Sequence, residues 1–471
     1  MNRRQFLASS ASLSGAFLLG QSNPVTVHVT VDPNRQLGRT PDDFLGFGYE
    51  ISSVAVKGLL AANNHKLLRY YGNLGPHGVV RIGGNTADFS TWSPNGQAVS
   101  APKATVTNRD VIADLGAFLR ASRWKLIWNL NLGSGTAESA ADQAVAIADA
   151  AKDRLLCFQI GNEPDLFARS GHRAGGFDYA AYHQEFSHFA SVLRKRLPDA
   201  PLAGPDVATA TAWVSSFAND EGKNIKLLTE HYYRAGQRQP AATIENLLHT
   251  DSRFVNMLEA LRAASHRFGT PYRLVELNSF SGGGKPGVSD TFASALWALD
   301  LLFTLSSYDG AGLNLETGLN QLGFVSPYSP IFDDEHGNLS ARPSYYAMLA
   351  FSMAGIGTRV QTDTTSPGIN LTSYGVSDGK GHTWITLINK DVDQKARVTI
   401  NSLSKVKSAE LIGLKAPSFD AKAGVTLAGA EVSPDGHWRA KDIEKLKLVA
   451  NGEITVEVQP ASVSLVRLIL R

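Results

Sequence analysis

The fold is decided by residues 155–165, LLCFQIGNEPD, in which a short apolar run ends in an amide and a carboxylate just before a proline. The apolar run is too short for a helix and contains no turn residue, so it predicts a buried strand. Asn162 and Glu163 then stand at the carboxyl end of that strand, and Pro164 ends it. A buried strand followed by polar side chains is therefore the unit to look for in the rest of the chain.

The same unit recurs along most of the chain, and stretches with helical spacing of apolar residues separate its copies. The expected strands are residues 43–50, 78–84, 125–133, 155–163, 201–206, 225–233, 272–278 and 310–318. The expected helical stretches include residues 111–121, 140–153, 179–197, 244–269 and 289–305, the last with Ser289 and Asp290 as N-cap residues. Eight such units fit a (β/α)8 TIM barrel better than a doubly wound sheet, because no G-x-G-x-x-G fingerprint follows the first strand.

A second domain is indicated where the pattern changes to short strands of alternating residues. The turn S-D-G-K-G at residues 377–381 separates two of these strands and is typical of a hairpin. We therefore expect an antiparallel β-sandwich over residues 359–471. Residues 25–32, VTVHVTVD, alternate in the same way, so residues 23–40 are expected to add a strand to that sandwich, leaving residues 41–358 for the barrel.

Composition and charge limit the classes of partner. The chain of 471 residues is 43% hydrophobic and carries a net charge of +2, which fits a globular protein and argues against a nucleic-acid partner. Residues 1–22 look like an export signal of the twin-arginine type, with Arg3 and Arg4 before a small apolar stretch, so the protein is expected in the periplasm or outside the cell. No later run is long enough for a membrane span, and Cys157, the one cysteine, lies in an apolar run.

The strand ends carry two carboxylates that suit acid–base chemistry. Glu163 ends the fourth expected strand and Glu276 ends the seventh, so both side chains lie at the mouth of one barrel. Cleavage of a glycosidic bond needs such a pair, in which one group protonates the leaving oxygen and the other attacks the sugar or activates water. Spacing along the chain does not show whether the second group attacks the sugar or activates water.

Motifs for other chemistry are missing. The chain has no H-E-x-x-H or paired-cysteine motif, and D-D-E-H at residues 333–336 is typical of a surface turn. The loop S-G-G-G-K-P-G is no phosphate loop, because Ser279 and Pro286 occupy positions where that motif requires Gly and Ser or Thr. No G-x-S-x-G elbow supports an esterase. We expect neither a cofactor nor a metal, and a carbohydrate as the partner.

Several motifs together resemble those of one family. G-N-E-P on the fourth strand, a Glu on the seventh, Arg81 on the second and H-Y-Y on the sixth look like the clan of retaining (β/α)8 glycosidases. Within that clan, RIGGNTADFSTW, QIGNEPDLF and VELNSFSGGGKPGVSDTFASALWALD resemble glycoside hydrolase family 79, the group of β-glucuronidases and heparanase. The resemblance covers most of the barrel and implies Glu163 as acid/base, Glu276 as nucleophile and retention of configuration.

Other strand-end residues are candidates for the substrate site. Asn162 can position a sugar hydroxyl beside the reacting carbon, and Arg81, by resemblance, hydrogen-bonds Glu276 and favours its ionised form. The remaining candidates are Glu50, Asn85, Asn131, His231, Tyr233, Ser281, Gly282, Gly283 and Tyr328. Of the pair His231 and Tyr233, we expect Tyr233 to donate a hydrogen bond to Glu276.

The loop after Glu276 bears on which sugar is bound. Its three glycines let backbone N–H groups approach an anion such as a sugar carboxylate. The β-glucuronidases of the family use a tyrosine and a glycine of this loop for the uronate, but this chain has Phe280 and Ser281 where the tyrosine is expected. Tyr328 is a candidate replacement from another loop.

Three functions remain open from the sequence. The first is a retaining exo-β-glucuronidase acting on glycans or glucuronide conjugates. The second keeps the mechanism but takes a neutral sugar or a disaccharide glycoside, which the missing tyrosine supports. The third is a carbohydrate-binding protein without catalysis, and the intact set Glu163, Glu276, Arg81 and Asn162 argues against it.

Overall fold

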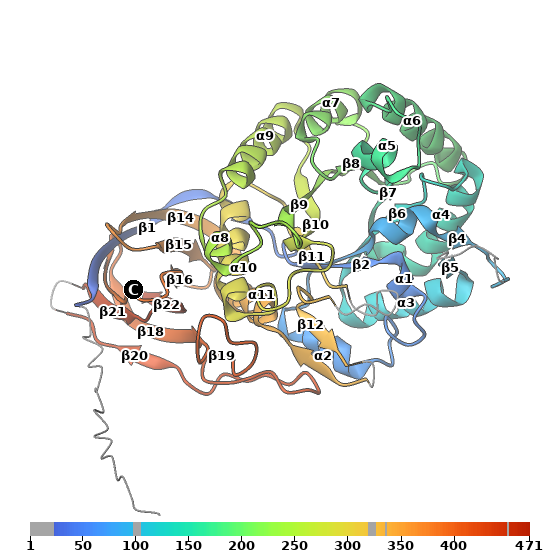
Figure 1. Ribbon diagram of the computed structural model, residues 1–471. Helices are drawn as coiled ribbons and strands as arrows, with labels where there is room; N and C mark the ends of the chain where they lie inside the picture. Colours follow the sequence, from blue (N-terminus) through green and yellow to red (C-terminus); the bar gives the residue numbers. More distant parts are fainter. Residues whose placement is uncertain (1–22, 98–104, 319–325, 335–336, 450–451) are drawn as a thin grey trace, which may run out of the picture.

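The computed structural model describes residues 23–97, 105–318, 326–334, 337–449 and 452–471. Eight parallel strands form a closed barrel in the order β10-β11-β2-β3-β6-β7-β8-β9 (Figure 1). They are β2 (Gly46–Glu50), β3 (Val79–Gly83), β6 (Lys125–Leu130), β7 (Leu155–Ile160), β8 (Leu202–Val207), β9 (Leu227–Gly236), β10 (Tyr272–Ser281) and β11 (Leu313–Glu316). Each coincides with one of the eight strands predicted from the sequence, and the TIM barrel is confirmed.

Helices surround the barrel as an outer ring (Figure 1). They are α1 (Ile51–Val54), α2 (His65–Asn73), α3 (Arg109–Ser122), α4 (Ala137–Ala151), α5 (Phe167–Ser170), α6 (Tyr179–Arg196), α7 (Thr211–Glu221), α8 (Ile244–Leu248), α9 (Ser252–Phe268), α10 (Phe292–Ser307) and α11 (Pro343–Ala354). Short 3-10 turns η1 (Asn85–Phe89), η2 (Lys152–Arg154) and η3 (Pro164–Leu166) and the pairs β4 (Thr91–Trp92) with β5 (Val106–Thr107) and β12 (Ile331–Asp333) with β13 (Leu339–Ala341) lie in the loops.

Two details of the helices differ from the sequence prediction. The stretch expected over residues 244–269 is two helices, because Asp251 caps α9 by accepting from the backbone N–H of Arg253. The N-cap of α10 is Thr291, without a side-chain cap bond, rather than Ser289 or Asp290. Ser289 instead lies 2.8 Å from the Ser279 hydroxyl, and Asp290 accepts from the backbone N–H of Gly287. Both side chains are therefore used to shape the loop before α10.

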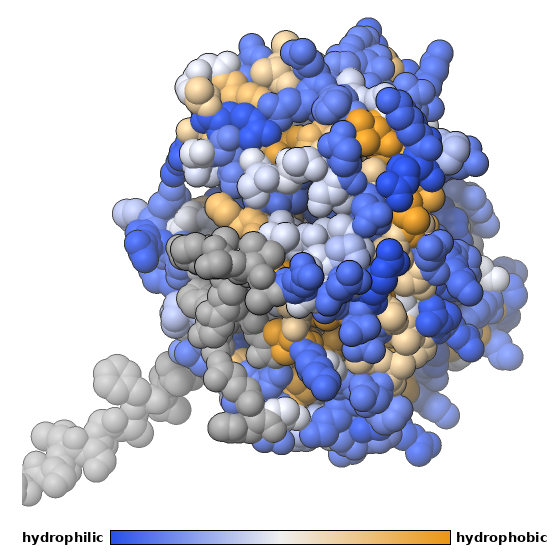
Figure 2. All heavy atoms as spheres, turned by 90° about the vertical axis from the view of Figure 1, so that its right-hand side faces the viewer, coloured by the Kyte–Doolittle hydropathy of each residue, from blue (hydrophilic) through white to orange (hydrophobic). Residues whose placement is uncertain are grey.

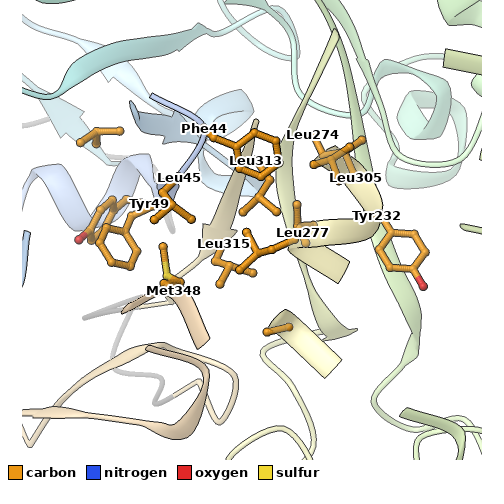
Figure 3. Packing of buried hydrophobic residues seen from close by; sticks show 14 of the residues in the cluster. Phe44, Leu45, Tyr49, Tyr232, Leu274, Leu277, Leu305, Leu313, Leu315 and Met348 are labelled. Carbon is orange, nitrogen blue, oxygen red and sulfur yellow. The ribbon is translucent and has the colours of Figure 1, made fainter. Parts of the chain in front are cut away.

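The main core lies between the barrel strands and the helices. Figure 3 shows part of it, in which Leu274 and Leu277 of β10 and Leu313 and Leu315 of β11 pack together. The face of the barrel on the right of Figure 1 is covered largely by polar side chains, with scattered apolar ones (Figure 2). The apolar side of the helices is thus turned toward the strands, as the helical spacing requires.

The second domain is a mostly antiparallel sheet of ten strands. These are β1 (Val25–Thr40), β14 (Gly357–Thr365), β15 (Leu371–Ser377), β16 (His382–Asn389), β17 (Ala396–Ser402), β18 (Val406–Lys415), β19 (Thr426–Leu427), β20 (Glu444–Leu446), β21 (Ile454–Val458) and β22 (Ser462–Leu470). Strand β1 pairs antiparallel with β14 but parallel with β17, which departs from the fully antiparallel arrangement expected from the sequence. Residues of β1, β17 and β21 share one core with residues of β15, β16, β18 and β22, so the sheet packs on itself.

Within the described ranges, no helix is both long and apolar enough to cross a membrane. The predicted export signal, residues 1–22, lies outside the described residues.

Candidate active site at the mouth of the barrel

A cavity of about 1010 Å³ opens where the barrel strands end. It is lined by residues that follow β7 and β8, by residues of β9 and β10 and the segments after them, by the end of β2 and by one face of α9. Glu163 and Glu276 are both in its wall. This is the carboxyl-terminal face, where TIM barrels place their reacting groups.

Glu276 is held on both carboxylate oxygens. Arg81 Nη1 donates to Oε2 at 2.6 Å, and the Tyr233 hydroxyl donates to Oε1 at 2.9 Å. Burial disfavours the charged form, but the charges of His231 and Arg81 and the hydrogen bond from Tyr233 outweigh it and hold the pKa of Glu276 below its usual value. Glu276 is therefore a fixed, ionised carboxylate.

Glu163 lies in a different environment. It has left-handed backbone dihedrals, φ 50° and ψ 51°, and its backbone N–H donates to the Asp206 carbonyl at 2.9 Å. Its Oε1 lies 3.0 Å from His231 Nδ1. Burial raises the pKa of Glu163, and the negative charge of Glu276 adds to this effect, although His231 opposes it. The two carboxyl groups thus have pKa values displaced in opposite directions, which suits an acid and a nucleophile.

An ion-pair network lies beneath these carboxyl groups. Asp206 accepts from Arg81 Nη2 and lies 3.0 Å from His231 Nε2. Burial opposes the ionisation of Asp206, yet the charges of His231 and Arg81 hold its pKa below the usual value. Burial lowers the pKa of His231, but the charges of Asp206 and Glu276 raise it well above its usual value. Two buried cations then balance two buried carboxylates, the condition under which buried charges persist.

Glu50 shapes one wall of the cavity. Its carboxylate accepts from the backbone N–H groups of Asn85 and Thr86 and from the Thr86 hydroxyl, which ties β2 to the start of η1. Gly84 has φ 73°, and a Cβ there would lie 2.4 Å from the Glu50 carboxylate, so only glycine fits. Burial and the charge of Glu276 raise the pKa of Glu50 to about 7.

The glycine loop lines another part of the cavity. Ser281, Gly282 and Gly283 line the cavity, and the two glycines have φ 82° and 94°. The Tyr328 N–H donates to the Gly283 carbonyl at 3.2 Å, and the Tyr328 ring stacks 6.3 Å from that of Tyr233. Phe280 is fully buried and does not line the cavity. Tyr328 therefore lines the cavity beside the glycine loop.

Not every predicted site residue reaches the cavity. Asn131 is 8% exposed and lies outside the lining, because its amide binds the Ser90 carbonyl, the Ser134 hydroxyl and the backbone N–H groups of Ser134 and Gly135. Asn162 lies beneath the lining, and its Oδ1 accepts from Arg81 at 2.7 Å. Arg81 is fully buried and His231 has both ring nitrogens beside carboxylates, so both hold carboxylates rather than sugar.

Asp206 was missed by the sequence reasoning, as was the cavity-lining Glu230. Asp206 is the last residue of the expected fifth strand and the last but one of β8, so its position near a strand end was the available signal. Gln159 and Asn129, within β7 and β6, also donate to Asp206. These polar side chains interrupt apolar runs, and only the barrel closure brings them together.

Three groups of the site could hold a metal ion by distance alone. Ligand atoms of Glu163, His231 and Glu276 lie within 4.8 Å of one another. Arg81 and Tyr233 already donate to the two oxygens of Glu276, however, and a metal cation would compete with the guanidinium charge. The same distance places one oxygen of Glu163 within 4.8 Å of one oxygen of Glu276.

Comparison with known proteins agrees with this geometry. Residues 369–465 match the model of the glycosyl hydrolase family 79 C-terminal beta domain. A β-glucuronidase of Aspergillus niger is 27% identical over 72% of this chain and 73% of that protein. The chain resembles glycoside hydrolase family 79. The predicted resemblance to this family is confirmed, and the chain is a glycosidase.

Other relatives match over smaller fractions of the chain. A β-glucuronidase of Neurospora crassa is 24% identical over 69% of the chain and 65% of that protein, and heparanase of Rattus norvegicus is 27% identical over 53% and 47%. A solved structure of a 4-O-α-L-rhamnosyl-β-D-glucuronidase from Fusarium oxysporum has a TM-score of 0.75 at 16% identity and covers 93% of this chain and 99% of that one. The last comparison shows the same fold.

Proposed function

We propose that the protein is a retaining exo-β-glucuronidase that acts on glycans or glucuronide conjugates. The observation that carries the mechanism is the distance between the two carboxyl groups, one oxygen of each lying within 4.8 Å of the other. Retaining glycosidases hold these groups about 5–5.5 Å apart, whereas inverting ones leave about 6.5–9.5 Å for a water molecule. The spacing supports attack by the enzyme on the sugar.

The roles follow from the environments of the two groups. Glu276, ionised and held by Arg81 and Tyr233, attacks the anomeric carbon, and the bond to the leaving oxygen breaks. Glu163 gives its proton to that oxygen and then, as a base, takes one from the water that hydrolyses the glycosyl ester. Asn162, which lies beneath the lining, orients Arg81 through its Oδ1.

The sugar specificity is proposed from the cavity wall and the relatives. The backbone of Gly282 and Gly283, with Ser281 and the Tyr328 hydroxyl, offers donors for a uronate carboxylate. Glu50 and Asn85 line the cavity as well. The relatives named β-glucuronidase support this sugar. A neutral sugar is the second candidate, favoured by Ser281 in place of tyrosine.

Two variants test the mechanism with aryl β-glucuronide and aryl β-glucoside as substrates. Glu276→Ala removes the covalent route and is expected to lose several orders of magnitude in kcat on every substrate. Glu163→Ala is expected to lose about 10²–10⁴ on poor leaving groups but far less on activated aryl glycosides. Glu245→Ala, on the exposed side of α8, is the matched control. Equal turnover by Glu276→Ala and the wild type contradicts the nucleophile, and preference for the glucoside contradicts the uronate.

We also propose that the protein is exported, which Arg3 and Arg4 at the start of an apolar stretch support. Arg3→Lys with Arg4→Lys is expected to keep the enzyme inside the producing cell, as activity in cell fractions would report. Unchanged export of the double variant contradicts a twin-arginine signal.

A further inference from the structure

A segment of the second domain contacts the barrel where the glycine loop ends. Residues 418–422, which we name the capping segment, lie between β18 and β19. Val425 and Leu427, just after this segment, are buried in the same core as the barrel helices. Figure 1 shows β19 beside α11. The capping segment is therefore anchored on the barrel, although it belongs to the other domain.

The capping segment completes the start of α10. The first N–H groups of a helix have no partner within the helix and need one outside it. Thr291, the N-cap residue, makes no side-chain cap bond. Instead, the backbone N–H of Phe292 donates to the Ala421 carbonyl at 2.8 Å. The backbone N–H of Ala293 donates to the Phe419 carbonyl at 2.7 Å. The second domain thus supplies the cap that Thr291 does not provide.

An ion pair joins the same segment to the glycine loop itself. Asp290 Oδ1 accepts from the backbone N–H of Gly287 at 2.6 Å, and its Oδ2 lies 2.9 Å from Lys422 Nζ. The side chain of Asp290 is 15% exposed and that of Lys422 is 56% exposed, so the charge attraction alone contributes little. The contact matters through its position, because one carboxylate links the loop backbone to the capping segment.

The glycine loop needs support because its backbone has unusual freedom. It runs from the end of β10 to the start of α10, and four of its residues have φ between 77° and 94°: Gly282, Gly283, Gly284 and Gly287. Glycine loses more conformational freedom on ordering than any other residue. Strand β10 fixes one end of this loop, and the capping segment fixes the other.

We propose that the capping segment determines sugar specificity by holding the glycine loop in the conformation that binds the uronate, with Asp290 and Lys422 as positioning residues. Ser281, Gly282 and Gly283 of this loop line the cavity. The inference rests on the proposed function, which assigns the uronate carboxylate to these residues. Donors that are held in place before the substrate arrives bind it at a lower entropic cost. A looser loop is therefore expected to weaken binding of the glucuronide and to spare the two catalytic carboxyl groups.

Two variants of the full-length protein loosen this support. Asp290→Ala removes the contacts to Gly287 and Lys422, and a second variant has glycine at all of residues 418–422, none of which is fully buried. The substrates are para-nitrophenyl β-D-glucuronide and β-D-glucoside. Each variant is expected to raise KM for the glucuronide by about threefold to thirtyfold and to change kcat by less than about twofold. The kinetics on the glucoside are expected to stay unchanged.

Asp435→Ala is the matched control. Asp435 lies between β19 and β20, and its carboxylate is 3.9 Å from Arg69 Nη2 of α2, a helix that does not line the cavity. This variant removes an ion pair between the same two domains without touching the glycine loop. It is expected to leave KM for both sugars unchanged.

Lys422→Ala tests whether the ion pair acts through Asp290. It is expected to raise KM for the glucuronide by about twofold, less than Asp290→Ala does, because Lys422 is largely exposed. Combined with Asp290→Ala it is expected to add nothing, since the two side chains form one contact. Independent effects that multiply in the double variant contradict that contact.

Amide hydrogen exchange measures the support without any substrate. Peptides that cover residues 281–293 are expected to exchange faster in both loosened variants and at the wild-type rate in Asp435→Ala. Exchange that is unchanged in both loosened variants overturns the inference, whichever sugar the enzyme cleaves.

The outcomes separate this inference from the proposed function. Equal changes of KM on both sugars, a fall in kcat alone, or an unchanged KM for the glucuronide in both loosened variants overturns the role of the capping segment in specificity. Failure of the wild type to cleave the aryl glucuronide overturns the proposed function, while hydrogen exchange still shows whether the capping segment holds the loop.

Discussion

His231 Nδ1 lies 3.0 Å from Glu163 Oε1 in the wall of the cavity. This hydrogen bond and the charge of the ring act against the burial that raises the pKa of Glu163. The same charge lowers the pKa of Glu276. One buried imidazolium therefore influences both limbs of the pH profile.

His231→Gln is expected to move both limbs of the profile of kcat/KM to higher pH. In the wild type, activity falls as pH drops through the lowered pKa of Glu276, and it falls again as pH rises through the raised pKa of Glu163. Without the ring charge both pKa values rise. Kinetics across the pH range check this; a profile that is only lowered, with both limbs in place, contradicts it.

Arg81→Lys is expected to lower kcat by about a hundredfold or more, while the charge balance of the buried network is kept. One guanidinium donates to Glu276, Asn162 and Asp206 at once, and a single ammonium group cannot reproduce this planar geometry. The acid limb is expected to move to higher pH, because Glu276 loses part of its stabilisation. Rates that match the wild type would show that Glu276 needs only a nearby charge.

Tyr233→Phe and Tyr328→Phe are expected to affect different quantities. Loss of the Tyr233 hydroxyl removes a hydrogen bond to the ionised Glu276, worth about 1.5–3 kcal/mol, and is expected to lower kcat on all substrates by about tenfold to a hundredfold. Loss of the Tyr328 hydroxyl is expected to raise KM for the glucuronide and leave the glucoside unchanged. Identical effects of the two variants on both sugars contradict the separate roles.

Gly84→Ala is expected to destabilise the protein more than Gly58→Ala, its matched control. Both glycines have left-handed backbone conformations, φ 73° and 80°, but only the Cβ at position 84 would meet a neighbour, the Glu50 carboxylate at 2.4 Å. The control thus carries the backbone strain alone, about 1–3 kcal/mol. Melting temperatures check the order, and equal losses would show that the Glu50 side chain moves aside at little cost.

Glu230→Gln is expected to make stability less dependent on pH. Burial raises the pKa of Glu230 from 4.5 to about 7, so between these values the folded protein binds this proton more tightly than the unfolded chain does. Stability then falls as pH rises through that window. The melting temperature of the variant minus that of the wild type is expected to be larger at about pH 8 than at about pH 5. Glu259→Gln, exposed, should show no such trend.

The barrel could be predicted because each of its strands corresponds to a short apolar run in the sequence. Every one of the eight apolar runs ends in a polar residue or a glycine, and closure of a parallel barrel brings those ends together whatever the exact register. Glu163 and Glu276 could therefore be paired from sequence, as could Arg81 and Tyr233 by resemblance. Only the structure, however, gives the distance between the two carboxyl groups.

The rest of the site depends on relations that sequence does not contain. Asn131 has the same position at a strand end as Asn162, yet local hydrogen bonds to the Ser134 loop compete for its amide. Asp206 gains its role only when His231 and Arg81 are folded around it. Glu230 precedes His231, and its sequence context indicates only a buried strand. Helix α9, which lines the same cavity, lies beyond α8 in the chain, so the sequence does not show that the two are close.

The position of β1 has a consequence for the order in which the protein can fold during synthesis. In the second sheet β1 lies between β14 and β17, and His28 faces Thr365 on one side and Thr399 on the other. The ribosome therefore delivers this strand before the barrel, and its partners after it. N-terminal parts of a chain generally fold first. The barrel can therefore close while both edges of β1 are still unpaired. Synthesis of β14 and β17 thus determines when β1 becomes protected from proteases and from strands of other chains.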